Sequence, residues 1–232
     1  MALTPDPGET FLREVDENLR RDQLQGVARR FGPLIAAGVV LLLVAVGGWL
    51  YWQDKQQKNA ARDSEQMAVI YKDISASNMA TVPQRLDALA ERGSDAIRAS
   101  ALFTRAAVAL EQNDRPAALA KYREVADDKG LPAPYRDLAL IRATTLEFDA
   151  LKPEQVIARM QPLTKPGNPW YGSAGELTGM ALIKQGKKLE AGRQFAAIAA
   201  DRQAPDSIRA RAVQIAGTLG VDATASLSSI AP

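Results

Sequence analysis

The protein has 232 residues, of which 47% are hydrophobic and 24% are charged, and it contains neither histidine nor cysteine. Without these two residue types it has no thiolate nucleophile, no histidine-based catalytic dyad, no disulfide and no zinc site with nitrogen or sulfur ligands. Its 29 basic and 27 acidic residues leave a net charge of +2, too small an excess for a nucleic-acid-binding surface. We therefore expect a non-enzymatic protein that needs no cofactor, metal or small-molecule substrate.

Residues 1–30 are expected to form a cytoplasmic arm with one short amphipathic helix. The sequence Asp6-Pro7-Gly8-Glu9 is typical of a helix start, with the aspartate as cap and proline in the first turn. Phe11, Val15 and Leu19 then recur every four residues and so share one face. This arm either contacts a membrane or partner, or only sets membrane topology. Gly32-Pro33 is expected to interrupt the helix.

Residues 31–52 are 22 residues without a charge. About twenty helical residues cross the hydrocarbon core of a bilayer, so we predict a transmembrane helix here; a buried core helix is the alternative. Trp49, Tyr51 and Trp52 suit the membrane interface at its end. No small-residue cleavage site follows, which favours an uncleaved anchor over a signal peptide.

The charges on either side of this segment predict its orientation. Four arginines lie in residues 18–30 and three cations in residues 53–68, which favours a cytoplasmic N-terminus and an exported C-terminal region. Two pairs of small residues could let the helix dock against another membrane helix, although lipid would tolerate them equally. These are Gly32 with Ala36, and Gly47 with Gly48.

The region after the membrane segment is rich in Ala, Leu, Arg and Gln and shows helical periodicity throughout. We expect membrane-proximal helices over residues 53–96, repeats over residues 97–219 and a flexible tail over residues 220–232. The predicted helices span residues 55–77, 83–92, 95–112, 116–128, 133–149, 153–162, 169–185, 188–201 and 205–218.

An internal repeat is visible at an offset of 73 residues. Placing residues 101–146 on residues 174–219 gives eleven identities without a gap. Alanine abundance does not explain all of them, because Gln, Asp, Pro and Arg also match, and Tyr122 falls on Phe195. Half of 73 is close to the 34-residue period of tetratricopeptide repeats. The sequence therefore predicts an all-α chain in which stacked helix hairpins form a short solenoid.

The turns of the two copies support hairpins. Gly186 occupies the turn of the second copy, where a positive φ carries no steric strain, and Asn113 occupies the equivalent place in the first. Ala181 and Ala191 would allow close helix approach, with Phe195 filling the space between pairs. A simple four-helix bundle is the structural alternative.

Such an array presents a concave face lined by the first helix of each pair, here residues 97–111, 135–148 and 173–185. The partner-binding candidates on or beside these helices are Arg105, Arg136, Arg142, Glu147, Trp170, Tyr171 and Lys184. Exposed aromatic residues often anchor interfaces. Each of these residues could instead be solvated or, for Trp170 and Tyr171, belong to the core.

The chain resembles the YfgM-like proteins over roughly residues 25–220. The motifs that carry the likeness are Gly48-Trp49-Leu50-Tyr51-Trp52, Glu176-Leu177, Gly179, Ala181-Leu182, Gly186, Ala191 and Phe195. Those proteins are ancillary subunits of the SecYEG translocon with a tetratricopeptide-like periplasmic domain. The resemblance implies a single-pass bacterial inner-membrane protein with a periplasmic domain. Its partners would be translocon subunits and a membrane-anchored periplasmic chaperone.

Two functions remain open at this point. The first is a membrane-anchored adaptor that links the translocon with periplasmic chaperones. The alternative is a membrane-tethered scaffold for envelope assembly or cell division, which would use the same fold for other clients. An enzyme acting on envelope polymers would require clustered acidic residues in a cleft.

Overall fold

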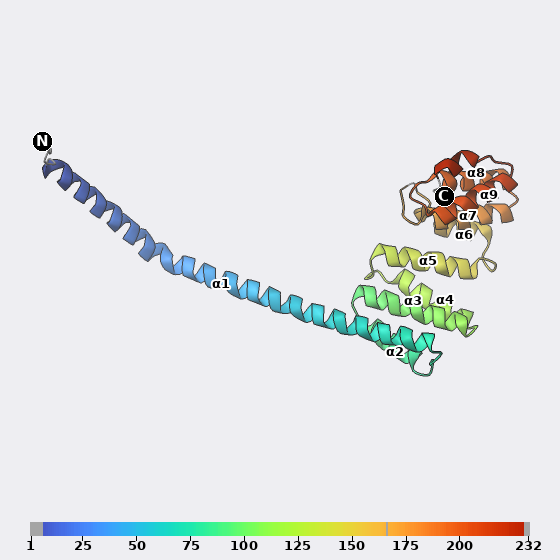
Figure 1. The fold of residues 1–232 in the computed structure, drawn as a ribbon, viewed down its shortest axis with the longest axis horizontal. Coiled ribbons are helices and arrows are strands. Elements are labelled where there is room, and N and C mark those ends of the chain that lie inside the picture. Colours follow the sequence, from blue (N-terminus) through green and yellow to red (C-terminus); the bar gives the residue numbers. More distant parts are fainter. Residues whose placement is uncertain (1–6, 166, 230–232) are drawn as a thin grey trace. The chain divides into compact units, whose positions relative to one another are not determined.

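The computed structural model describes residues 7–165 and 167–229; for residues 7–33, 35, 36, 39 and 227–229 it describes the backbone only. The described residues form nine α-helices and two 3-10 helices (Figure 1). In chain order these are α1 (Pro7–Ser75), α2 (Val82–Arg92), α3 (Asp95–Glu111), α4 (Arg115–Asp127), α5 (Ala133–Glu147), α6 (Pro153–Met160), η1 (Gln161–Leu163), α7 (Tyr171–Lys184), α8 (Lys188–Ala200), α9 (Asp206–Thr218) and η2 (Thr224–Ser229).

The chain divides into two units, Met1–Ala61 and Arg62–Pro232, and α1 contributes to both. The break expected at Gly32-Pro33 is wrong, because the backbone is helical from Pro7 to Ser75. A proline inside a helix removes one backbone hydrogen-bond donor and so destabilises the helix locally. Extension of an existing helix is favourable, in particular through the Gln-, Lys- and Ala-rich residues 53–62. The predicted arm helix, the predicted membrane helix and the first of the predicted membrane-proximal helices, residues 55–77, are therefore parts of one continuous helix.

In the first unit, α1 exposes a run of large apolar side chains. They include Leu41, Leu42, Leu43, Val44, Trp49 and Trp52, each more than half exposed. Within the described residues, no helix meets the length and hydropathy needed to cross a bilayer. The predicted span over residues 31–52 includes six positions at which the side chains lie outside the described part of the chain.

The second unit is a stack of helix hairpins in which helices pack against their neighbours in the chain. The most extensive contacts join α2 to α3, α3 to α4, α4 to α5, α7 to α8 and α8 to α9. Nearest-neighbour packing of this kind is the arrangement of a helical solenoid rather than of a single four-helix bundle. Residues 62–75 of α1 complete the first hairpin, because Met67 and Ile70 are buried with Leu86 and Leu89 of α2.

The 73-residue repeat is reproduced by the helices themselves. The starts of α4 and α8 and of α5 and α9 are 73 residues apart, as are the ends of α3 and α7 and of α4 and α8. Both hairpin turns use a positive φ, 60° at Asn113 and 77° at Gly186. A further turn is conserved between the copies, because Asp128 and Asp201 each accept a hydrogen bond from the backbone N–H two residues later.

The same equivalence extends into the core. Phe195 of α8 and Tyr122 of α4 occupy matching positions, and both are buried. Phe195 lies against Gly179 of α7, where an added Cβ would be 2.6 Å from the phenyl Cε2. The matching position in the first copy is Ala106, which is fully buried. The glycine therefore allows α7 to approach the larger aromatic face of α8 closely.

The C-terminal segment differs from the flexible tail expected over residues 220–232. In its described part, Ala223 is buried and Val221 packs with the hydrophobic cluster of α8 and α9. Gly192 leaves room for this contact, because an added Cβ there would lie 2.6 Å from Val221 Cγ2. The segment that leads into η2 thus packs on α9.

Candidate functional site

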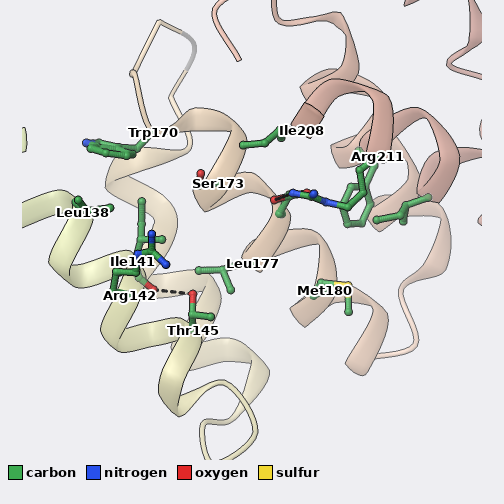
Figure 2. Close-up of a pocket in the computed structure, with 13 residues that line it drawn as sticks. Leu138, Ile141, Arg142, Thr145, Trp170, Ser173, Leu177, Met180, Ile208 and Arg211 are labelled. Carbon is green, nitrogen blue, oxygen red and sulfur yellow. Dashed lines mark hydrogen bonds and ion pairs between the residues drawn. The ribbon is translucent and has the colours of Figure 1, made fainter. Parts of the chain in front are cut away.

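A groove with a volume of about 590 Å³ lies between α5, α7 and α9 (Figure 2). These helices are alternate members of the stack, so the groove runs along one face of it. The sequence predicts a concave face formed by the first helix of each pair, and α5 and α7 are two of those helices. That prediction did not include α9, which forms the third wall of the groove.

The groove has an apolar floor. It is formed by Leu138, Ile141, Leu177, Met180, Phe195, Ile208 and Ile215. The side chain of Met180 is large and apolar, yet it is 43% exposed within the groove. Apolar area that remains in contact with water is the main source of free energy for binding a partner.

Two arginines line the groove on opposite walls (Figure 2). Arg211 of α9 makes a bidentate pair with Glu176 of α7, with Nε–Oε1 and Nη2–Oε2 distances of 2.6 and 2.8 Å. This hydrogen-bonded pair raises the pKa of Arg211 further above its ordinary value. The pair thus joins α7 to α9 through two parallel charge-assisted hydrogen bonds.

Arg142 of α5 is in a different state. It is exposed and lines the groove beside Ile141, and no described residue forms a hydrogen bond or ion pair with it. The neighbouring Thr145 hydroxyl is already engaged, since it donates to the Ile141 carbonyl oxygen over 2.8 Å. Arg142 therefore offers five free N–H donors at the edge of an apolar surface.

A second, smaller groove of about 330 Å³ lies between the end of α1 and α3. Its α3 residues Phe103, Thr104 and Ala107 fall 73 positions before Glu176, Leu177 and Met180 of the larger groove. The α3 wall of the smaller groove thus corresponds in part to the α7 wall of the larger one and carries different side chains at the matching positions.

Of the residues predicted from sequence to bind a partner, the structure places Arg142 and Trp170 in the groove. Trp170 precedes α7 and is half-buried, and its backbone N–H donates to the Asn168 side chain over 2.8 Å. Tyr171 instead packs with the cluster of α8 and α9. Burial, assisted by the Asp201 carboxylate, raises the pKa of its hydroxyl, which is the state of a core residue.

The remaining charged candidates lie outside the groove. Glu147 accepts from both Arg123 and Arg159, the latter at 2.9 Å, and so joins α4, α5 and α6. Lys184 is 3.1 Å from Asp149 and 4.5 Å from the centre of the Phe148 ring. Glu147 therefore connects successive helices, and Lys184 connects α7 to the turn that follows α5.

Arg105 and Arg136 also lie on helices of the inner face without lining the groove. Arg105 is 3.7 Å from Asp87 of α2. The buried Nε of Arg136 has no hydrogen-bond partner among the described residues. Its counterpart in the second copy, Arg209, donates to the Ala199 carbonyl over 3.1 Å and to Asp206 over 2.9 Å. Ala133 occupies the place of Asp206 in the first copy, so the arginine there lacks this carboxylate.

The predicted sites of membrane-helix packing fall in two classes. Gly47 and Gly48 have no atom within 4 Å of an added Cβ, so this surface of α1 is open. Gly32 and Ala36 are in the part of α1 at which only the backbone is described, and their packing lies outside the described residues.

Several groove residues were not anticipated from the sequence. Met180 and Ile208 are ordinary apolar positions in a helical pattern, and nothing in that pattern distinguishes a groove floor from a core. The Arg211–Glu176 pair had a detectable signal, since its members are 35 residues apart, one repeat period, on successive inner helices. A search for opposite charges at that spacing would have found it.

The groove contains few charged groups. Its one lining carboxylate, Glu176, is held by Arg211. Across the described residues, no cluster of acidic side chains could hold a metal ion. The groove thus combines an apolar floor, an aromatic edge at Trp170 and one unpaired guanidinium.

Comparison with known proteins identifies the fold family. Residues 28–216 match the model of the tetratricopeptide repeat-like domain, which covers most of the chain. No curated protein and no solved structure matches the sequence. Repeats of this type form protein-binding surfaces by stacking helix hairpins, and the matched region includes all three walls of the groove. The chain therefore belongs to the tetratricopeptide repeat-like domain family.

Proposed function

We propose that this protein is a non-enzymatic, membrane-anchored adaptor that holds segments of other proteins in the groove between α5, α7 and α9. The observation that carries the proposal is the groove itself, with its apolar floor, the exposed Met180 and the unpaired Arg142. A soluble domain has no structural need to leave these groups in water. They are the groups that a partner would cover.

Anchoring by residues 31–52 is supported by the 22-residue uncharged run and by the exposed apolar side chains of α1. A continuous surface of this kind would be unfavourable in water. The arginines before the run favour a cytoplasmic N-terminus and a periplasmic repeat domain in a bacterial inner membrane. A tether of this kind raises the effective concentration of the groove toward partners that are also bound to the membrane.

The resemblance to YfgM-like proteins supports SecYEG translocon subunits and a membrane-anchored periplasmic chaperone as the partners. A scaffold for envelope assembly or cell division would use the groove in the same way for other clients. The two functions therefore differ in the identity of the bound protein.

A site-specific photocrosslinking experiment in intact cells tests the proposal. A photoreactive residue replaces Met180 on the groove floor, and a matched control replaces Leu189, which is 56% exposed on α8 and does not line the groove. The Met180 probe should capture translocon or chaperone subunits that the Leu189 probe does not. Capture of division or cell-wall proteins by Met180 would favour the scaffold instead. Identical products from both probes would contradict groove binding altogether.

A further inference from the structure

The groove contains one arginine that has no acidic partner among the described residues. Seven of the fourteen arginines of the second unit form an ion pair in the structure. They are Arg85, Arg98, Arg105, Arg123, Arg159, Arg209 and Arg211. Arg142 has none among the described residues, and it stands on the α5 wall, across the groove from the paired Arg211 (Figure 2).

The repeat gives a second view of the same position. The residue 73 places after Arg142 is Ile215 of α9, which lines the same groove. The third helix of the second copy thus packs with an apolar side chain at this place. A cation at position 142 is consequently not required by the packing of the repeat.

The chemistry of the surroundings restricts what can cover Arg142. A partner that fills the groove removes water from the guanidinium, and a buried charge without a counter-charge is costly. A basic segment would add repulsion to that cost, whereas a carboxylate would offset it with a charge-assisted hydrogen bond. Glu176 cannot fill this role, because both its oxygens are engaged by Arg211.

We propose that the groove accepts a protein segment that carries an acidic side chain next to large apolar ones, and that Arg142 is the specificity-determining residue that binds the carboxylate. The apolar side chains rest on the floor around Ile141, Leu177 and Met180. The inference rests on the proposed binding function and adds to it the chemical class of the bound segment.

The test measures binding of three fluorescent synthetic peptides to the full chain in lipid nanodiscs, with empty nanodiscs as background. The peptides share one length and one pattern of leucines and differ only in their polar residue, which is Glu, Gln or Lys. The Glu peptide should bind most tightly and the Lys peptide least. The substitution Arg142→Gln should weaken the Glu peptide by about threefold to tenfold, the range for a partly desolvated ion pair, and leave the Gln peptide unchanged.

Arg193→Gln is the matched control, because Arg193 is exposed on α8, makes no ion pair with a described residue and does not line the groove. It should alter none of the three affinities. Arg142→Glu should reverse the preference, so that the Lys peptide binds more tightly than the Glu peptide. Such a reversal is not produced by a merely structural change.

The outcomes separate the two proposals. If all three peptides bind equally, and Met180→Trp still blocks them, the groove binds segments but the charge inference is overturned. Equal losses in Arg142→Gln and Arg193→Gln would also overturn it, because they would reflect only net charge. If no peptide binds in the groove and Met180→Trp has no effect on any of them, both proposals fail.

Discussion

The two copies of the 73-residue repeat, α3–α4–α5 and α7–α8–α9, share their framework and differ in their grooves. The hairpin turn, the buried aromatic of the second helix and the Asp turn before the third helix are each present twice. In the groove, by contrast, Phe103, Ala107 and Arg142 of the first copy correspond to Glu176, Met180 and Ile215 of the second. Packing thus determines the residues at the framework positions, whereas the residues at the groove positions can differ and are available for binding.

Substitutions at the shared framework positions should destabilise the fold, whereas substitutions at the groove positions should not. Equivalent framework residues of the two copies should show similar losses, except at the few positions where the copies differ. The unfolding free energy of the full chain, measured by urea denaturation with circular dichroism, is the common measure.

The largest effect is expected at the shared aromatic. Phe195→Ala should cost about 3–5 kcal/mol, because the ring is 1% exposed and its removal leaves a cavity against α7. Tyr122→Ala, at the same place in the first copy, should cost a similar amount. A loss below 1 kcal/mol at Tyr122 would mean that the two positions are not equivalent in packing.

The next effect concerns the contact between Gly179 and Phe195. Gly179→Ala should destabilise by about 1–3 kcal/mol, because its new methyl group overlaps the Phe195 ring. Gly217→Ala in α9 is the control, since nothing lies within 4 Å of an added Cβ there, and it should stabilise by about 0.5–1 kcal/mol. Similar changes for both glycines would contradict the close approach of α7 and α8.

A third comparison uses Arg209 and Arg136, which occupy matching positions in the two copies. Arg209→Met should destabilise by about 1–3 kcal/mol, since it leaves the Ala199 carbonyl without its Nε donor and removes the pair with Asp206. Arg136→Met should be neutral or slightly stabilising, because the buried Nε of Arg136 has no described partner. A large loss at Arg136 would show that its guanidinium contributes to packing as Arg209 does.

The smallest effect is at the turns. Gly186→Ala should cost about 1–2 kcal/mol, because φ is 77° and an L-residue is strained there. Asn113→Gly, at φ 60°, should change stability by only a few tenths of a kcal/mol or raise it, since glycine relieves the same strain. The opposite order would contradict the equivalence of the two turns.

The framework could be read from the sequence because it depends on local rules repeated at a fixed offset. Gly186 and Asn113 marked the turns, and the helix limits from α2 to α9 agree with expectation to within about two residues. The continuity of α1 was missed at Pro33. Proline is a strong signal in isolation, but the favourable extension of helix on both sides outweighs the one lost hydrogen bond.

The groove could be predicted only in outline. Periodicity placed Arg142, Glu147 and Lys184 on inner helices, but it does not tell which of them meets a partner on the next helix. Glu147 and Lys184 make contacts to neighbouring helices or turns, whereas Arg142 has no described partner because Glu176, the one carboxylate that lines the groove, is paired with Arg211. That distinction depends on contacts between residues one repeat apart, which follow from the stacking rather than from the pattern within one helix.

We propose above that the groove between α5, α7 and α9 holds partner proteins. The most direct measurement is recovery of partners by pulldown from gently solubilised membranes after the groove is filled by Met180→Trp, with Leu189→Trp on α8 as the matched control. Both side chains are exposed, so neither change should impair folding. We predict that Met180→Trp releases the partners and that Leu189→Trp retains them. Equal recovery with both variants would contradict the claim.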